Sequence, residues 1–134
     1  MKTFLTLFVL LFSSSVVAED KKLFCADTQV GGYDGDSNYS ELKTYNNKKF
    51  TINVNIEEEL ILGDEVLLYP DTAKCRYISS KSFGEYDSFM FCSDYFTSFT
   101  INLNNYNYVR TFSFGYVMSK EDDISIGYGT CEKF

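Results

Sequence analysis

Histidine is absent from this 134-residue chain, and its absence excludes several kinds of active site. Serine and cysteine nucleophiles are usually activated by a neighbouring imidazole, and the chain supplies none. The glycine-rich signatures of P-loop and Rossmann nucleotide sites are missing as well. A carboxylate pair could still cleave a glycosidic bond, but among 19 acidic residues some pair is inevitable. We therefore expect a protein that is not an enzyme, with a carboxylate-based hydrolase as the alternative.

Positive charge is scarce, because 12 Lys and Arg residues stand against 19 Asp and Glu residues. The resulting net charge of −7 repels phosphate groups, and no basic stripe interrupts the acidic sequence. We expect no nucleic acid among the partners of this protein.

Long hydrophobic runs are also lacking, apart from one near the N-terminus. Lys2 precedes the apolar run Phe4–Phe12, and small residues follow with Val16 and Ala18 at the −3 and −1 positions of a cleavage site. This is the pattern of a secretory signal peptide, and the run is too short to span a bilayer. The sequence predicts cleavage directly after Ala18.

The predicted organisation is a signal peptide over residues 1–18 and a single domain over residues 19–134. No later apolar run is long enough to form a membrane helix. We therefore expect a periplasmic or secreted monomer without a membrane span.

Closely spaced cysteines are missing too, although the chain has four cysteines. Zinc sites use Cys-x-x-Cys or histidine pairs, so we expect neither zinc nor another cofactor. An even number of cysteines in an exported domain predicts two disulfides. Cys75 and Cys92 are equally distant from a turn at residues 83–84, so they face each other if this segment is a hairpin. That leaves Cys25 to pair with Cys131, which ties the first strand to the last.

The single proline and the many Phe, Tyr, Ile, Val and Thr residues favour strands. Three stretches alternate apolar and polar residues and so predict strands with one side in the core: residues 50–56, 99–103 and 124–129. In the last stretch, Ile124, Ile126 and Tyr128 are expected to face the core.

Weaker patterns predict the remaining strands, and no stretch has convincing helical periodicity. Residues 106–118 are interpreted as one long strand, and the shorter candidates are residues 23–28, 60–62, 66–69, 73–79 and 88–93. About eight strands joined by short polar turns predict an all-β fold, a single antiparallel barrel or sandwich. We expect apolar side chains to fill its interior.

Arg110 is the candidate binding residue, because it shares a strand face with Tyr108 and Phe112. One interpretation is that its stem packs beside aromatic rings while the guanidinium reaches water or a carboxylate. The other is that it contacts an anion or carboxylate at the mouth of a barrel.

The segment "DGDSNYSE" resembles part of a calcium loop. Asp34, Asp36 and Asn38 occupy its first, third and fifth positions. The sixth position should be Gly and is Tyr39, and the twelfth should be Glu and is Tyr45. We therefore predict a solvent-exposed connection to the "FTINVNI" strand that binds no metal.

Motifs along the chain resemble those of a family of small exported bacterial proteins of unassigned function. They are Cys25, Gly32-Tyr33, Met90 or Phe91 beside Cys92, Phe99–Asn102, Arg110 with Phe112, and Gly129 with Cys131. The resemblance implies export, a β fold and disulfides, and it implies no chemistry. The expected function is non-catalytic binding or interaction in the envelope, with an unknown protein or small molecule as partner. A periplasmic inhibitor of an envelope-targeting enzyme is the alternative.

Overall fold

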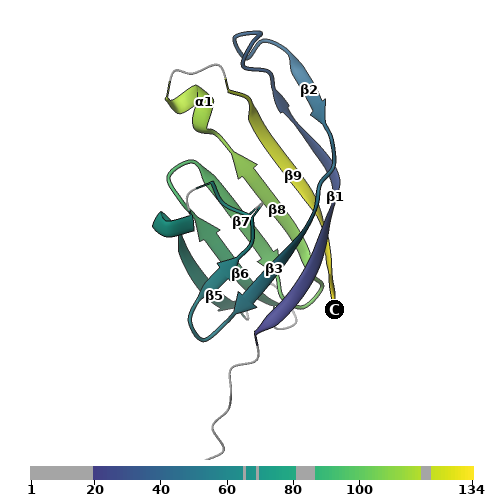
Figure 1. Cartoon of the computed structure of the whole chain (residues 1–134), viewed down its shortest axis with the longest axis vertical. Helices are drawn as coiled ribbons and strands as arrows, with labels where there is room; N and C mark the ends of the chain where they lie inside the picture. Colours follow the sequence, from purple (N-terminus) through teal and green to yellow (C-terminus); the bar gives the residue numbers. More distant parts are fainter. Residues whose placement is uncertain (1–19, 65, 69, 81–86, 119–121) are drawn as a thin grey trace, which may run out of the picture.

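The computed structural model describes residues 20–64, 66–68, 70–80, 87–118 and 122–134. The expected signal peptide and its cleavage site lie outside these ranges. Figure 1 shows the arrangement of the elements along the chain.

The described residues form one antiparallel sheet of nine strands that curls into a nearly closed barrel. The strand order is β4-β3-β1-β9-β8-β7-β6-β5, and β2 pairs with β1 beside this path. The all-β barrel predicted from the sequence is thereby confirmed. The strands are β1 (Lys21–Tyr33), β2 (Leu42–Tyr45), β3 (Lys49–Asn55), β4 (Leu60–Leu62), β5 (Lys74–Ser80), β6 (Asp87–Ser93), β7 (Thr97–Asn102), β8 (Asn107–Phe112) and β9 (Ile124–Lys133).

Two short helical elements accompany the sheet: the 3-10 turn η1 (Pro70–Thr72) and the helix α1 (Phe114–Val117). No helix among the described residues is long and apolar enough to cross a membrane. At the seam of the barrel, where β4 and β5 approach, the Glu59 side chain accepts a hydrogen bond from the Tyr77 backbone N–H at 2.9 Å.

The strands β3 and β7 bury their alternating apolar residues as the sequence predicts. Along β7, Thr97, Phe99 and Ile101 are buried, and the residues between them are partly exposed. The inward residues of β1, β3, β6 and β7 meet in one core that includes Leu23, Ile52, Val54, Met90, Phe99 and Ile101.

Both predicted disulfides are present. Cys25 of β1 bridges to Cys131 of β9, and Cys75 of β5 bridges to Cys92 of β6. Each pair occupies directly opposite positions on neighbouring strands. The bridge between Cys25 and Cys131 therefore locks the first strand beside the last.

The predicted inward face of β9 is wrong. Ile126 and Tyr128 are 55% and 49% exposed, whereas Gly127 and Gly129 are buried. The register that pairs Cys25 with Cys131 turns the glycines inward. A Cβ atom on Gly129 would lie 2.1 Å from the Ala26 carbonyl oxygen, so only glycine fits there.

The long strand predicted over residues 106–118 is also wrong in its second half. The strand β8 ends at Phe112, and α1 begins at Phe114. The helix lies close to the residues that precede β9, since a Cβ atom on Gly115 would lie 2.0 Å from the Asp122 carbonyl oxygen. Residues 66–68 form no strand either, although Val66 and Leu67 are buried; Tyr69 lies outside the described residues.

Candidate functional site

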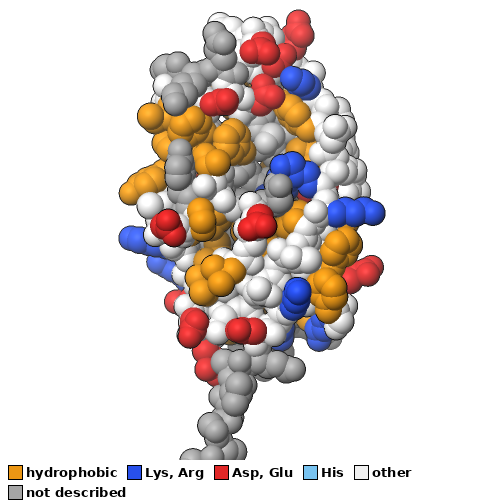
Figure 2. Space-filling view, viewed as in Figure 1, with side chains coloured by type: hydrophobic (Ala, Val, Ile, Leu, Met, Phe, Trp, Pro, Cys, Tyr) orange, Lys and Arg blue, Asp and Glu red, His pale blue; other side chains and the backbone are white. Residues whose placement is uncertain are grey.

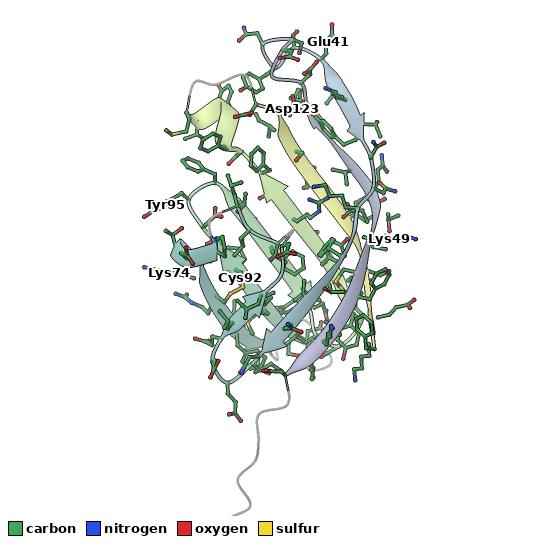
Figure 3. The ribbon with its side chains drawn as sticks, in the orientation of Figure 1. Glu41, Lys49, Lys74, Cys92, Tyr95 and Asp123 are labelled. Atoms are coloured by element: carbon green, nitrogen blue, oxygen red, sulfur yellow. A yellow bond between two sulfur atoms is a disulfide. The ribbon has the colours of Figure 1, made fainter. Side chains whose placement is uncertain are left out.

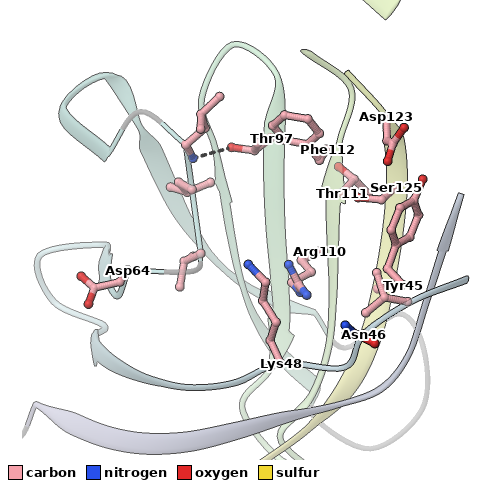
Figure 4. A pocket seen from close by; sticks show the side chains of 15 residues that line it. Tyr45, Asn46, Lys48, Asp64, Thr97, Arg110, Thr111, Phe112, Asp123 and Ser125 are labelled. Carbon is pink, nitrogen blue, oxygen red and sulfur yellow. Dashed lines mark hydrogen bonds between the residues drawn. The ribbon is translucent and has the colours of Figure 1, made fainter. Parts of the chain in front are cut away.

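A cleft of about 350 Å³ opens into one end of the barrel. Its walls come from β8 and β9 on one side and from the segment around Asp64 and Val66 on the other (Figure 4). The expectation of a filled interior is therefore wrong at this end. One reason is that β9 turns the small residues Ser125 and Gly127 into the cleft. The sequence instead predicts that the larger Ile126 and Tyr128 face inward.

The length of β1 explains why this end stays open. One half of β1 pairs with β3, and the other half, Val30–Tyr33, pairs with the short β2. The hairpin of β1 and β2, together with β9 and α1, extends beyond the remaining strands (Figure 1). At this end, strands are consequently present on one side of the barrel only, and the cleft lies against the inner face of those strands.

Arg110, which lines the cleft, forms an ion pair with the buried Asp27. The side chain of Asp27 is 0% exposed and that of Arg110 is 18% exposed. The Arg110 Nη2 atom donates to Asp27 Oδ2 at 2.6 Å, and its Nε atom donates to Oδ1 at 3.1 Å. This two-point contact fixes the plane of the guanidinium.

Two further donors complete the surroundings of Asp27. The Tyr108 hydroxyl donates to Oδ1 at 2.8 Å, and the backbone N–H of Lys48 donates to Oδ2 at 2.8 Å. The Asp27 N–H in turn donates to the Lys48 carbonyl at 2.9 Å. The Tyr108 ring stacks on Phe99 at 5.3 Å, which joins this polar group to the core.

These contacts set the charges of the network. Burial alone would raise the pKa of Asp27, but the hydrogen bonds from Arg110, Lys48 and Tyr108 outweigh it and lower that pKa. Burial and the bond to Asp27 raise the pKa of Tyr108. The network therefore holds a carboxylate, a guanidinium and a neutral phenol.

A bulge in β1 directs two residues into the barrel. The register with β9 shifts between Asp27 and Gln29, and both Asp27 and Val30 are buried. Without the shift, alternation would place residues 27 and 30 on opposite faces. The bulge lets Asp27 hold Arg110 while Val30 lines the cleft.

Of the three binding residues predicted from the sequence, the structure places two in the lining of the cleft and one below it. Arg110 and Phe112 line the cleft, and Tyr108 lies beneath it in the network. Asp27 was missed. Its signal is the alternation of Leu23, Cys25 and Asp27, which puts an acid at a core position.

The mouth of the cleft carries a second polar group. Asp123 accepts a hydrogen bond from the Gly35 N–H at 2.7 Å, and that bond is the main cause that lowers its pKa. Burial, and then the neighbouring Asp123, raise the pKa of Tyr45 to about 12. Glu41 and Asp123 mark this end in Figure 3, and Figure 2 shows acidic side chains gathered there.

The "DGDSNYSE" segment is the turn between β1 and β2, so it leads to β2 and not directly to the strand of residues 50–56. It is also less exposed than predicted, because Gly35 is buried. Lys43 Nζ lies 3.6 Å from Asp34 Oδ1 and 3.7 Å from Asp123 Oδ2. A cation from the protein itself therefore lies between these carboxylates.

We expect no calcium binding at this turn. Within the described ranges, no three His, Cys, Asp or Glu residues are placed to hold a metal ion. Titration calorimetry with calcium should give no heat, and the melting temperature should not change with chelator. The double variant Asp34→Ala, Asp36→Ala is the control. Micromolar binding that disappears in this variant would contradict the prediction.

Comparison of the chain with protein-family models, curated proteins and solved structures finds no match. The residues of the cleft are therefore the basis for the function proposed below.

Proposed function

We propose that this chain is an exported, non-catalytic binding protein that holds a small ligand in the cleft at the open end of the barrel. The cleft itself carries the proposal. Its volume of about 350 Å³ lies within the usual range of ligand pockets. Its lining combines apolar residues, such as Val30, Leu67 and Phe112, with polar and charged ones, of which Arg110 is held in place by Asp27.

Two disulfides support export, because such bonds persist in oxidising compartments. They agree with the signal peptide predicted for residues 1–18. Together they support a periplasmic or extracellular location.

The pKa shifts of Asp27 and Asp123 argue against either of them acting as a general acid. A general acid needs a carboxyl group whose pKa is raised towards neutrality. The pKa of Asp123 is lowered by its bond from Gly35, and the pKa of Asp27 is lowered by its donors although burial opposes this. Both are suited to hold cations or N–H groups and not to donate a proton.

Binding can be tested by titrating ¹⁵N-labelled protein with probes that share one body and differ in head group: phenylacetate, phenylacetamide, phenethylamine and phenethyl alcohol. We expect amide shifts at Arg110, Phe112 and Gly127 with at least one probe, because these residues line the cleft. The absence of shifts with all four probes would contradict the proposal.

Two phenylalanine variants of β9 provide the matched control. Ser125→Phe places a ring in the cleft, since Ser125 lines it. Thr130→Phe adds the same ring to an exposed position of the same strand. Binding should be lost in the first variant and kept in the second, and binding that survives in Ser125→Phe would place the ligand elsewhere.

A further inference from the structure

Three consecutive apolar side chains are exposed at the open end of the barrel. Tyr116 and Val117 of α1 and Met118, which caps it, are 63%, 61% and 48% exposed. The helix meets the rest of the protein through Gly115, which is buried against the Asp122 carbonyl. The larger side chains of this single turn are therefore left facing solvent.

Two more exposed side chains extend this surface. Tyr95 is 75% exposed and Leu68 is 44% exposed. The Phe96 ring lies 6.2 Å from that of Tyr95 and 4.9 Å from that of Phe114 in α1, and the Leu68 N–H donates to Thr97 directly after Phe96. Figure 2 shows hydrophobic side chains gathered on this flank of the molecule. We call the five exposed residues the α1 patch: Leu68, Tyr95, Tyr116, Val117 and Met118.

Packing within the fold explains exposed apolar residues elsewhere, but it does not explain the α1 patch. On β9, the exposed Tyr128 lies directly opposite Val109 of β8, and such cross-strand pairs stabilise a sheet. In α1, an exposed valine makes no cross-strand pair and is a weak helix former. Neighbouring apolar side chains that are exposed without a gain in stability indicate an interaction site.

Carboxylates border the α1 patch on the side of the turn between β1 and β2. The Tyr39 ring of this turn packs edge-to-face on Tyr116 at 5.0 Å, and its hydroxyl donates to the Asp122 carbonyl at 3.1 Å. Residues 34–45 and 122–123 contain one cation, Lys43, and five carboxylates: Asp34, Asp36, Glu41, Asp122 and Asp123. Residues 119–121, outside the described ranges, contain one lysine and one glutamate and leave this balance unchanged.

The negative charge of this border is only partly neutralised. Lys43 lies between Asp34 and Asp123. Among the described residues, no ion pair engages the remaining three carboxylates, those of Asp36, Glu41 and Asp122. A cationic group of a partner would be attracted to this border, while an apolar group beside it would cover the α1 patch.

The same charges disfavour two other occupants of the surface. A second copy of the chain would bring its own acidic border to a symmetric interface, where like charges repel. An anionic lipid surface attracts basic segments and repels acidic ones. A protein segment with lysine or arginine beside an apolar anchor matches both features of the surface.

We propose that the α1 patch is a docking surface for a basic segment of a partner protein. An aliphatic or aromatic side chain of the segment packs on Tyr116 and Val117, and its cations lie against Asp36, Glu41 and Asp122. This interaction goes beyond the small-ligand cleft. Among the described patch residues, only Leu68 also lines that cleft.

Three synthetic peptides of equal length test the chemistry of the partner. The first contains lysine, leucine and phenylalanine; the second has glutamate in place of lysine; and the third has serine in place of leucine and phenylalanine. We expect the first peptide to bind about tenfold or more tightly than either other, because both the anchor and the charge contribute. Its binding to ¹⁵N-labelled protein should shift the amides of Tyr95, Tyr116 and Val117 and leave those of Ile126 and Tyr128 in place.

Two serine variants locate the apolar contact. Tyr116→Ser, Val117→Ser removes two exposed side chains from the α1 patch, and the affinity for the first peptide should fall about tenfold or more. Ile126→Ser, Tyr128→Ser removes similarly exposed side chains from β9 and should leave the affinity unchanged.

Two amide variants locate the charge contact. Asp36→Asn, Glu41→Gln removes two exposed carboxylates beside the patch, so the affinity and its dependence on salt should both fall. Glu57→Gln, Glu58→Gln removes the same charge from the exposed turn between β3 and β4 and should change both much less.

Each outcome supports or overturns the docking surface. A preference for the first peptide that falls in the α1 variant and in Asp36→Asn, Glu41→Gln, but not in their controls, supports it. No binding of the first peptide, equal binding of the glutamate peptide, or equal losses in a variant and its control overturns it. Self-association in sedimentation, or binding to phosphatidylcholine vesicles, that is lost in Tyr116→Ser, Val117→Ser would identify a different occupant and also overturn it.

The cleft and the α1 patch are tested separately. Ser125→Phe fills the cleft and should leave peptide binding unchanged. Loss of peptide binding in Ser125→Phe would place the peptide in the cleft and overturn docking on the patch.

Discussion

Replacement of Arg110 by alanine is expected to destabilise the fold by about 3–5 kcal/mol. The sequence alone predicts a loss of only about 1 kcal/mol, which is the usual cost of removing a partly exposed arginine. The structure revises that value because Asp27, the partner of Arg110, has a fully buried side chain. Without Arg110, a buried carboxylate keeps only the bonds from Tyr108 and Lys48. Urea unfolding followed by circular dichroism measures the loss.

A double-mutant cycle separates the ion pair from simple loss of packing. In the variant Asp27→Asn, Arg110→Met, no charge is left without its partner, so the loss should be clearly smaller than the sum of the two single losses. Arg76→Ala is the control, because Arg76 is exposed on β5 and its removal should cost less than about 0.5 kcal/mol. A loss near 1 kcal/mol for Arg110→Ala would show that water reaches Asp27.

Acid offers a second measurement of the same pair. The folded state lowers the pKa of Asp27, so the carboxylate stabilises the fold at pH values above its ordinary pKa of about 4. That contribution is lost as the pH falls from about 4 through the lowered pKa. The stability of the native chain should therefore fall more steeply below about pH 4 than that of the Asp27→Asn, Arg110→Met variant.

Strands with one buried face were predictable from the sequence, because alternation is a direct consequence of the pleat. Phe99 and Ile101 in β7 show this, since both are fully buried. In β9 the same rule gave the wrong face. There Gly127 and Gly129 turn inward, and Ile126 and Tyr128 stay outside. A glycine has no side chain whose hydrophobicity could show that it faces inward. Gly129 is required at its position because the Ala26 carbonyl and the Tyr108 hydroxyl leave no room for a Cβ atom.

The candidate site was predictable only in part, for a related reason. Arg110 and Phe112 share a strand face, and a period of two is enough to place them together. The partner Asp27 lies 83 positions from Arg110 in sequence, and only the neighbouring positions of β1, β9 and β8 in the sheet bring it close. The bulge after Asp27 and the helix after Phe112 are local departures from regular pairing, and alternation alone cannot predict either.

Removal of the disulfide between Cys25 and Cys131 is expected to cost more than removal of the disulfide between Cys75 and Cys92. The first bridge joins residues 106 positions apart and the second joins residues 17 positions apart. In the chain-entropy model these loops correspond to about 5 and about 3 kcal/mol. The burial of Cys25 and Cys131 adds a packing loss in the same direction, because Cys75 is partly exposed.

The measurement is urea unfolding of two double variants, Cys25→Ala, Cys131→Ala and Cys75→Ala, Cys92→Ala. Each keeps the other bridge, so each serves as the control for the general effect of two alanines. The native chain under reducing conditions tests whether loss of both bridges exceeds either single loss. A larger loss for the pair on β5 and β6 would mean that the seam beside β4 limits stability. In that case unfolding begins between β4 and β5, where backbone pairing does not close the sheet. The bridge between Cys25 and Cys131 would then contribute less stability than its 106-residue separation implies.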